Sequence, residues 1–285
     1  MIETTWHDPI RRWEAAQRAA NLSPTTLRLY LHYLHHLARV CPDPWTVTSD
    51  DLAAFVDRDG WAPQSRKSAR TSVRHFYRWA VRTGRLSSSP ADALDAVRVP
   101  DGYARPAPDG ALRDALTAAD DRTALMLMLA ALAGLRAMEV AAVHTRDVEP
   151  DRLVVRSGKG GKVRTVPLHP VLGEALEAEL ARRRAGRVGT GWRYAEWVTA
   201  DGWLFPGQRG GHLSAGDVTR KLSRALGEDW TAHTLRHRLA TAAYAGTRDL
   251  RAVQELMGHS KPETTARYTA VPQDAKRAAV AAVGL

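Results

Sequence analysis

Hydrophobic positions recur at helical spacing through the first hundred residues. One apolar stripe, with steps of three and four residues, comprises Leu27, Tyr30, Leu31, Leu34 and Leu37. The pairs Asp8-Pro9 and Ser23-Pro24 each put a capping residue directly before a proline, which is typical of a helix start. We therefore predict helices that begin after Asp8 and after Ser23, and a third helix over residues 49–58.

A fourth predicted helix, over residues 63–83, has an apolar side and an arginine ridge, and Gly84 ends it. The ridge has an arginine at every fourth position: Arg66, Arg70, Arg74, Arg78 and Arg82. A charged helix face is usually only solvated, but like charges at this spacing repel each other by roughly a few tenths of a kcal/mol per pair. Phosphate groups would neutralise them. We expect the first four arginines of the ridge to contact a nucleic-acid backbone.

Residues 99–110 are rich in proline, glycine and aspartate and lack periodicity, so we expect a linker there. The nearly all-apolar residues 122–133 predict a buried helix. Two strands, over 153–156 and 163–168, flank the turn SGKGGK, and further helices are predicted over 170–184, 214–226, 233–245 and 249–257. The expected fold is mainly α. An all-helical domain over 1–98 precedes a mixed α+β, mostly helical domain over 111–285 with a small antiparallel sheet.

Composition and charge limit the class of protein. The 285 residues are 44% hydrophobic and 25% charged, as in soluble globular proteins, and the net charge of +10 favours a polyanionic partner. The single cysteine, Cys41, leaves no internal disulfide and no cysteine-rich zinc site, and its neighbours indicate a packing role. No signal peptide or long apolar run is present, so we expect a cytoplasmic protein without membrane contact.

Polar residues stand in the second domain where the local pattern requires none. Arg136 directly follows the buried helix, and Glu139 lies three residues later on the same helical face. The other candidates come from the hairpin turn, HTLRH, GHS and TARYTA: Lys159, Lys162, His233, Arg236, His259 and Tyr268. Each of them alone has an ordinary structural explanation.

Together these side chains suit the metal-free transfer of a phosphodiester. Two arginines can stabilise charge on the non-bridging oxygens, a lysine or histidine can protonate the leaving 5′ oxygen, and a tyrosine can supply the nucleophile. A free tyrosine has a pKa of about 10 and is protonated at neutral pH, so nearby cations and a proton acceptor must favour the phenolate. We expect neither a metal nor a cofactor. His32, His35 and His36 lie on an apolar helix without accompanying carboxylates, which argues against a metal site there.

The order of these motifs resembles the tyrosine recombinase, or phage integrase, family. The segments AGLRAMEV, GKGGKVRTVPL, HTLRH, LMGHS and TARYT carry the resemblance, which spans the second domain. All six catalytic positions match: Arg136, Lys159, His233, Arg236, His259 and Tyr268. The helical first domain is similar to the core-DNA-binding domain of the same family.

The resemblance implies a role for each matching residue. Arg136 and Arg236 would clamp the scissile phosphate, which His259 would also contact. Lys159 would be the general acid for the departing 5′ hydroxyl. Tyr268 would form a 3′-phosphotyrosyl bond, which conserves the energy of the broken strand, so that no ATP is needed.

Supporting roles follow from the same resemblance. His233 would assist proton transfer at the nucleophile, Glu139 would support the arginine cluster, and Lys162 would touch the DNA backbone. The enzyme would act on double-stranded DNA as a homotetramer on two DNA sites, in the cytoplasm at the nucleoid, with accessory DNA-bending or directionality proteins as further partners. The alanine-rich residues 273–285 would dock on a neighbouring subunit, although a frayed terminus is an equal alternative.

Several functions stay open. Integration or excision of a phage or other mobile element competes with the resolution of chromosome or plasmid dimers by a Xer-like recombinase, and the tryptophan-rich residues 186–202 favour integration. A catalytically inactive DNA-binding regulator is one alternative. A metal-dependent nuclease that uses His233, His237 and His259 is another, and a relaxing topoisomerase without sequence preference is a third.

Overall fold

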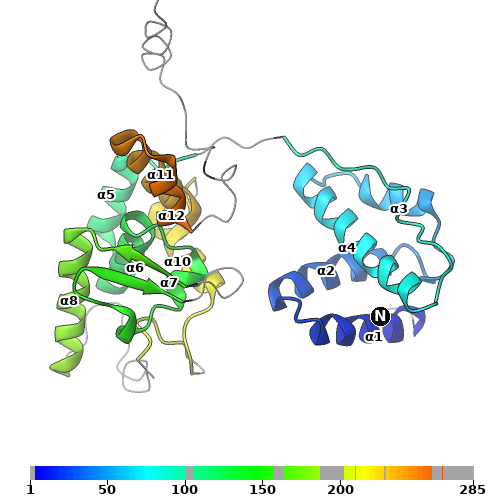
Figure 1. Cartoon of the computed structure of the whole chain (residues 1–285), viewed down its shortest axis with the longest axis horizontal. Coiled ribbons are helices and arrows are strands. Elements are labelled where there is room, and N and C mark those ends of the chain that lie inside the picture. The colour runs from blue at the N-terminus through cyan, green and yellow to red at the C-terminus, as the bar shows by residue number, and fades with distance from the viewer. Residues whose placement is uncertain are drawn as a thin grey trace, which may run out of the picture. The chain divides into compact units, whose positions relative to one another are not determined.

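A computed structural model of the chain describes residues 4–100, 105–156, 163–186, 202–208, 210–227, 229–258 and 265. The chain divides into two compact units, Met1–Asp101 and Gly102–Leu285. Figure 1 shows helices alone in the first unit and helices with a small sheet in the second, as the sequence predicts. Within the described residues, no helix has the length and apolar character needed to cross a membrane.

The first unit consists of α1 (Thr4–Ala19), α2 (Pro24–Leu37), α3 (Ser49–Val56) and α4 (Pro63–Arg82). The start predicted for α2 is confirmed, since the Ser23 hydroxyl accepts a hydrogen bond from the Thr26 amide at 3.2 Å. The apolar stripe of α2 and the apolar side of α4 pack against each other in one core, which includes Leu34, Val73 and Phe76.

The predicted start of α1 is wrong, because this helix begins at Thr4, five residues before the predicted first residue Pro9, which lies inside it. Trp6, Ile10 and Trp13 are buried on one face, so the apolar stripe extends on both sides of the proline. The indole nitrogen of Trp6 also donates to the Cys41 carbonyl at 2.6 Å. Burial of this face outweighs the single backbone hydrogen bond that the proline removes.

The second unit contains α5 (Asp109–Ala118), α6 (Asp121–Leu132), α7 (Ala137–Ala141), a 3-10 helix η1 (Thr145–Asp147), β1 (Arg152–Val155), β2 (Arg164–Pro167), α8 (Pro170–Arg184), α10 (Ala215–Leu226), α11 (Ala232–Thr247) and α12 (Leu250–Met257). The buried helix that the sequence predicts is confirmed as α6. It packs against α5, α7, α8, α10 and α11, which explains why its side chains are apolar nearly all round.

The predicted hairpin is also confirmed. Strands β1 and β2 pair antiparallel, with Arg152 opposite Pro167 and Val155 opposite Arg164. Leu153 and Val166 are buried in the core that surrounds α6. Because alternate residues of a strand share a face, Arg164 points to the same side as the buried Val166. The hairpin turn, residues 157–162, lies outside the described residues.

Candidate active site

Arg136 and Glu139 pair at the start of α7. The Arg136 amide donates to Oε2 of Glu139 at 2.9 Å, and its Nη1 donates to Oε1 at 2.9 Å. The Glu139 side chain is fully buried, whereas the Arg136 side chain is 32% exposed. A buried carboxylate therefore holds a guanidinium group that still reaches the surface.

Arg164, from β2, is a second partner of Glu139. Its Nη1 and Nη2 donate to Oε1 and Oε2 at 2.8 Å each, and its side chain is only 13% exposed. This fork-to-fork contact offsets the cost of burying the carboxylate. No role for Arg164 was predicted from the sequence. The alternation of residues in β2 could have indicated such a role. It puts Arg164 on the same face as the buried Val166, and an arginine that faces the core requires a buried acidic partner.

These contacts determine the ionisation of Glu139. Burial by itself raises the pKa of a carboxyl group, but hydrogen bonds from Arg164 and the Arg136 amide, together with both guanidinium charges, outweigh it and lower the pKa to about 2. Glu139 is consequently an anion at neutral pH. It can orient cations but cannot donate a proton.

Arg236 approaches the same region from α11. It is 2% exposed, and its two terminal nitrogens donate to the carbonyls of Gly134 and Met257. Arg136 follows Gly134 by two residues, and its Nη2 lies 3.5 Å from the Gly258 carbonyl. Both guanidinium groups thus meet the turn at 257–258, and Arg236 also binds the turn from which Arg136 projects.

Both turns require glycine. Gly134 has φ +62°, and a Cβ there would lie 2.8 Å from Leu239 Cδ2. Gly258, which ends α12, has φ +58°, and a Cβ there would lie 2.9 Å from Arg164 Cδ. Any larger residue would strain the backbone and also displace the side chains that pack against these turns.

The other predicted catalytic residues are only partly described. His233 is exposed in the first turn of α11, with its ring 4.2 Å from the ring of His237, whereas Arg236 faces the core. Lys159, Lys162, His259 and Tyr268 lie outside the described residues, as does most of the tryptophan-rich segment. In the part of the chain that the structure describes, no group of three or more His, Cys, Asp or Glu side chains could hold a metal ion.

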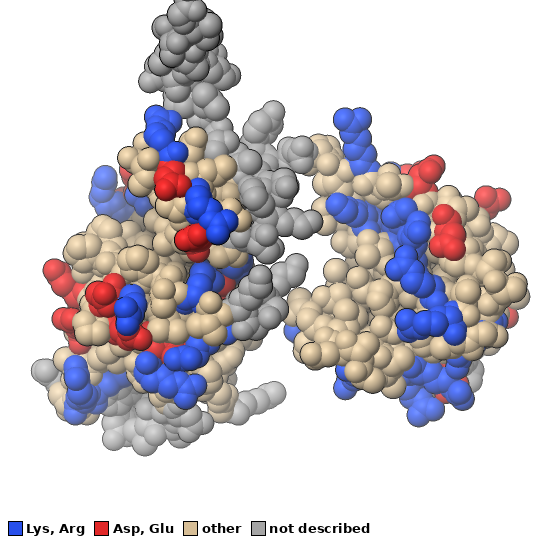
Figure 2. Space-filling view, viewed as in Figure 1, with Lys and Arg blue, Asp and Glu red and all other residues tan. Residues whose placement is uncertain are grey.

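The arginine ridge of α4 divides into two kinds of residue. Figure 2 shows a band of basic side chains over α4. Arg66 pairs with Asp57, and Arg70 donates from Nε and Nη2 to the Leu94 carbonyl at 3.2 and 2.7 Å. Arg74 lies 3.7 Å from Asp92, and Arg78 is exposed. Arg70 therefore holds the segment after α4 in place, while Arg78 is open to a partner from solution.

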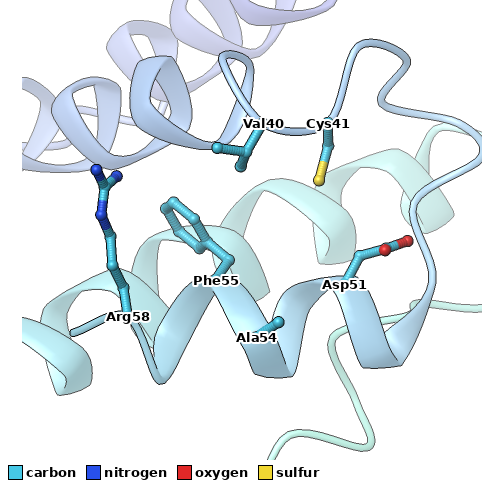
Figure 3. A pocket seen from close by; sticks show the side chains of 6 residues that line it. All are labelled: Val40, Cys41, Asp51, Ala54, Phe55 and Arg58. Atoms are coloured by element: carbon cyan, nitrogen blue, oxygen red, sulfur yellow. The ribbon is translucent and has the colours of Figure 1, made fainter.

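A cavity of about 320 Å³ lies between α3 and the connection that precedes it. In Figure 3, Phe55 and the Cys41 sulfur point into this space. The Asp51 carboxylate accepts from the amide and hydroxyl of Thr48 at 2.9 and 2.7 Å, so it serves as a helix cap. Burial, followed by the charge of Asp51, raises the pKa of Cys41, which keeps the thiol protonated and unreactive.

Sequence comparisons identify relatives of both units. Residues 111–274 match the phage integrase family, and residues 10–84 match the phage integrase N-terminal SAM-like domain. Tyrosine recombinase XerC of Corynebacterium efficiens is 32% identical over 265 residues, which cover 87% of this chain and 82% of the relative. Tyrosine recombinase XerC of Myxococcus xanthus is 34% identical over 222 residues, which cover 74% and 72% of the two chains.

Solved structures share the fold. A lambda integrase dimer bound to a COC′ core site superposes with a TM-score of 0.71 at 21% identity, over 92% of this chain and 76% of that chain. XerH bound to its difH substrate before cleavage gives a TM-score of 0.68 at 18% identity, over 94% and 82%. The family match covers more than half of the sequence, and the XerC relatives align through most of both chains. The chain therefore belongs to the phage integrase family and is a tyrosine recombinase.

Proposed function

We propose that this site-specific recombinase breaks double-stranded DNA by attack of the Tyr268 oxygen on a phosphodiester. The attack forms a 3′-phosphotyrosyl bond and releases a 5′ hydroxyl. The 5′ hydroxyl of the partner duplex then attacks the phosphotyrosyl phosphorus, which joins the exchanged strands and releases the Tyr268 oxygen. The proposal rests on one geometric observation, the approach of the Arg136 and Arg236 guanidinium groups to the same turn at 257–258. Two guanidinium groups at one place can stabilise the charge that develops on a pentacoordinate phosphate.

The charges of the described cluster support this reaction. Arg136 and Arg164 share a single carboxylate, that of Glu139, so this group of three side chains carries a net positive charge. Arg236 is fixed by two carbonyls and Arg136 by one carboxylate, which leaves little reorganisation when a phosphate binds. An anion held between them would gain from both charges.

Proton transfer falls to residues at the remaining family positions. We propose that Lys159 gives a proton to the leaving 5′ oxygen, that His233 accepts the proton of Tyr268, and that His259 contacts the phosphate. The exposed place of His233 at the start of α11 supports its role, since an imidazole there is accessible to a group from another segment.

DNA binding would involve the first unit as well. We propose that Arg74 and Arg78 contact the phosphate backbone, that Lys162 does so from the hairpin turn, and that Arg66 and Arg70 mainly hold the fold around α4. We further propose a homotetramer on two DNA sites at the nucleoid, with accessory DNA-bending proteins as partners. A solved relative, the lambda integrase tetramer bound to a Holliday junction, supports the tetramer at a TM-score of 0.69.

Two biological roles use this chemistry. The tryptophan-rich segment favoured integration or excision of a mobile element, whereas relatives more than 30% identical carry the name XerC and favour the resolution of chromosome dimers. Deleting the gene distinguishes the two roles. Loss of dimer resolution gives multimeric chromosomes in dividing cells, and loss of an integrase abolishes circular forms of the element without affecting chromosome number.

The nucleophile is tested with a nicked suicide duplex taken from DNA that flanks the gene. The wild-type protein should form a covalent adduct that survives denaturing electrophoresis and is unaffected by EDTA. Tyr268→Phe should form none, because the ring lacks the attacking oxygen. An adduct that persists in this variant contradicts the assignment of Tyr268, and a free phosphate end that requires a divalent metal indicates a nuclease instead.

A further inference from the structure

Arg164 is a nearly buried cation to which the proposed reaction assigns no step of its own. Both of its terminal nitrogens lie 2.8 Å from Glu139, and this carboxylate also binds Arg136 through both oxygens. Oε1 therefore accepts from both guanidinium groups, while Oε2 accepts from Arg164 and from the Arg136 amide. The position of the Arg136 guanidinium therefore depends on how Arg136 and Arg164 share the Glu139 carboxylate.

Arg164 also contacts a second part of the site. Its Cδ, Nε and Nη1 would lie 2.9, 3.1 and 3.2 Å from a Cβ at Gly258, so the side chain packs directly against this turn. The Gly258 carbonyl lies 3.5 Å from Nη2 of Arg136, and the preceding Met257 carbonyl accepts from Arg236. One side chain of β2 thus touches both the start of α7 and the end of α12.

We propose that Arg164 is a positioning residue for the strand-cleavage reaction. It occupies one side of the Glu139 carboxylate and thereby limits the Arg136 side chain to a single hydrogen bond with this carboxylate, so that the guanidinium stays directed to the phosphate. It also supports the turn at Gly258, from which the chain continues to His259. This inference rests on the proposed function.

Removing Arg164 would change how Arg136 binds the Glu139 carboxylate. Without its fork, both carboxylate oxygens would be available to Arg136, and a bidentate pair with Arg136 would be the strongest contact left. That pairing would rotate the guanidinium toward the core and away from the DNA. Lysine at position 164 would keep the charge but could not bind both oxygens at once, because an ammonium group lacks the planar fork.

The protonation of Glu139 provides a second readout. The charges that lower its pKa are those of Arg164 in β2 and Arg136 at the start of α7. Two other described helices that pack on α7 carry charged residues that are not among the causes of this shift, namely Asp121 and Arg122 of α6 and Asp217, Arg220, Lys221 and Arg224 of α10. Losing Arg164 leaves burial, which raises the pKa of a carboxyl group, opposed by Arg136 alone. Since the wild-type pKa is about 2, only the variant would lose ionised Glu139 as the pH falls below neutral.

The test compares adduct formation by full-length variants on the nicked suicide duplex in single turnover from about pH 8 to about pH 5.5. Arg164→Gln should slow the reaction by about 10- to 100-fold with DNA affinity unchanged, as is common for residues that orient a charged ligand-binding group. Its rate should fall more steeply than that of the wild type toward low pH. Combining Glu139→Gln with Arg164→Gln should remove the additional fall in rate at low pH, because an amide does not titrate.

Two further variants make the result decisive. Arg164→Lys should fold and show a reduced rate with a wild-type pH profile, because it keeps the charge and loses the fork. Arg152→Gln, in β1, removes an exposed arginine of the same hairpin, which pairs with Glu149 at 2.6 Å, and should match the wild type. Wild-type rates and pH profiles in both Arg164 variants would overturn the inference and leave the proposed function intact. An adduct with Tyr268→Phe would overturn the proposed function instead.

Discussion

The arginines of α4 and those around Glu139 differ in the burial of their acidic partners. Arg74 lies 3.7 Å from Asp92, whose side chain is 69% exposed, and Arg78 faces solvent. Arg164, in contrast, lies 2.8 Å from both oxygens of the fully buried Glu139. Exposed pairs contribute roughly 0–1 kcal/mol, whereas breaking a buried pair costs about 3–5 kcal/mol.

This difference in burial suits the two groups of arginines to different tasks, namely affinity for the DNA backbone and orientation of the reacting phosphate. An arginine with a weak, exposed partner can turn toward any phosphate within reach, which suits contacts along a DNA backbone. An arginine fixed by a buried carboxylate or by carbonyls can meet a phosphate at only one place, as stabilising a transition state requires. The same residue type therefore serves two purposes, and three predictions test whether burial is what distinguishes them.

The largest effect should follow from Arg236→Lys. A lysine keeps the charge but cannot reach the carbonyls of Gly134 and Met257 together. We expect adduct formation on the suicide duplex to slow by about 10²- to 10³-fold, the usual loss when one transition-state donor is removed. DNA affinity in a gel-shift assay should change little. A variant that loses affinity and keeps its cleavage rate would contradict the division between the two groups of arginines.

A smaller effect is expected from Gly258→Ala, with Gly186→Ala as its control. The two glycines have φ values of +58° and +67°, but only at Gly258 would a Cβ meet Arg164, and nothing lies within 4 Å of a Cβ at Gly186. Backbone strain of about 1–2 kcal/mol is common to both. Thermal unfolding should show a larger loss for Gly258→Ala, and only this variant should cleave more slowly. Equal losses would mean that Arg164 adjusts without cost.

The smallest effect on cleavage should come from α4. Arg78→Gln should weaken DNA binding by less than about tenfold and reduce the salt dependence of affinity by about one phosphate contact. Arg70→Gln should instead lower the stability of the first unit by about 1–3 kcal/mol, because the Leu94 carbonyl loses its donor. Fluorescence anisotropy at several salt concentrations and chemical denaturation distinguish these outcomes. If the salt dependence of DNA affinity were unchanged in Arg78→Gln, the proposed contact of α4 with the DNA backbone would be contradicted.

Local signals in the sequence predicted much of the fold. The cap at Ser23, the apolar side of α4 and the paired strands were all recognised because each depends on neighbouring residues. The five residues of α7 are too few to show a helical period. The true start of α1 depends on where Trp6 packs, which no local pattern contains.

The candidate site shows the same limit. A spacing of three residues predicted that Arg136 and Glu139 lie on the same face, and the structure pairs their side chains. The carbonyls that hold Arg236 belong to residues 102 and 21 positions away, so no local spacing could indicate them. Arg164 lies between these cases. Strand alternation could have indicated a buried cation, which our sequence reading missed, but it could not have named the partner.

The reach of these contacts along the chain has a consequence for biosynthesis. Arg136 contacts the Gly258 carbonyl across 122 residues, so the guanidinium groups cannot gather until α12 has joined the rest of its unit. Closing such long loops is entropically costly and comes late in folding. Nascent or misfolded chains would consequently lack an assembled phosphate site, and a protein that breaks DNA strands would acquire this ability only once its folding is complete.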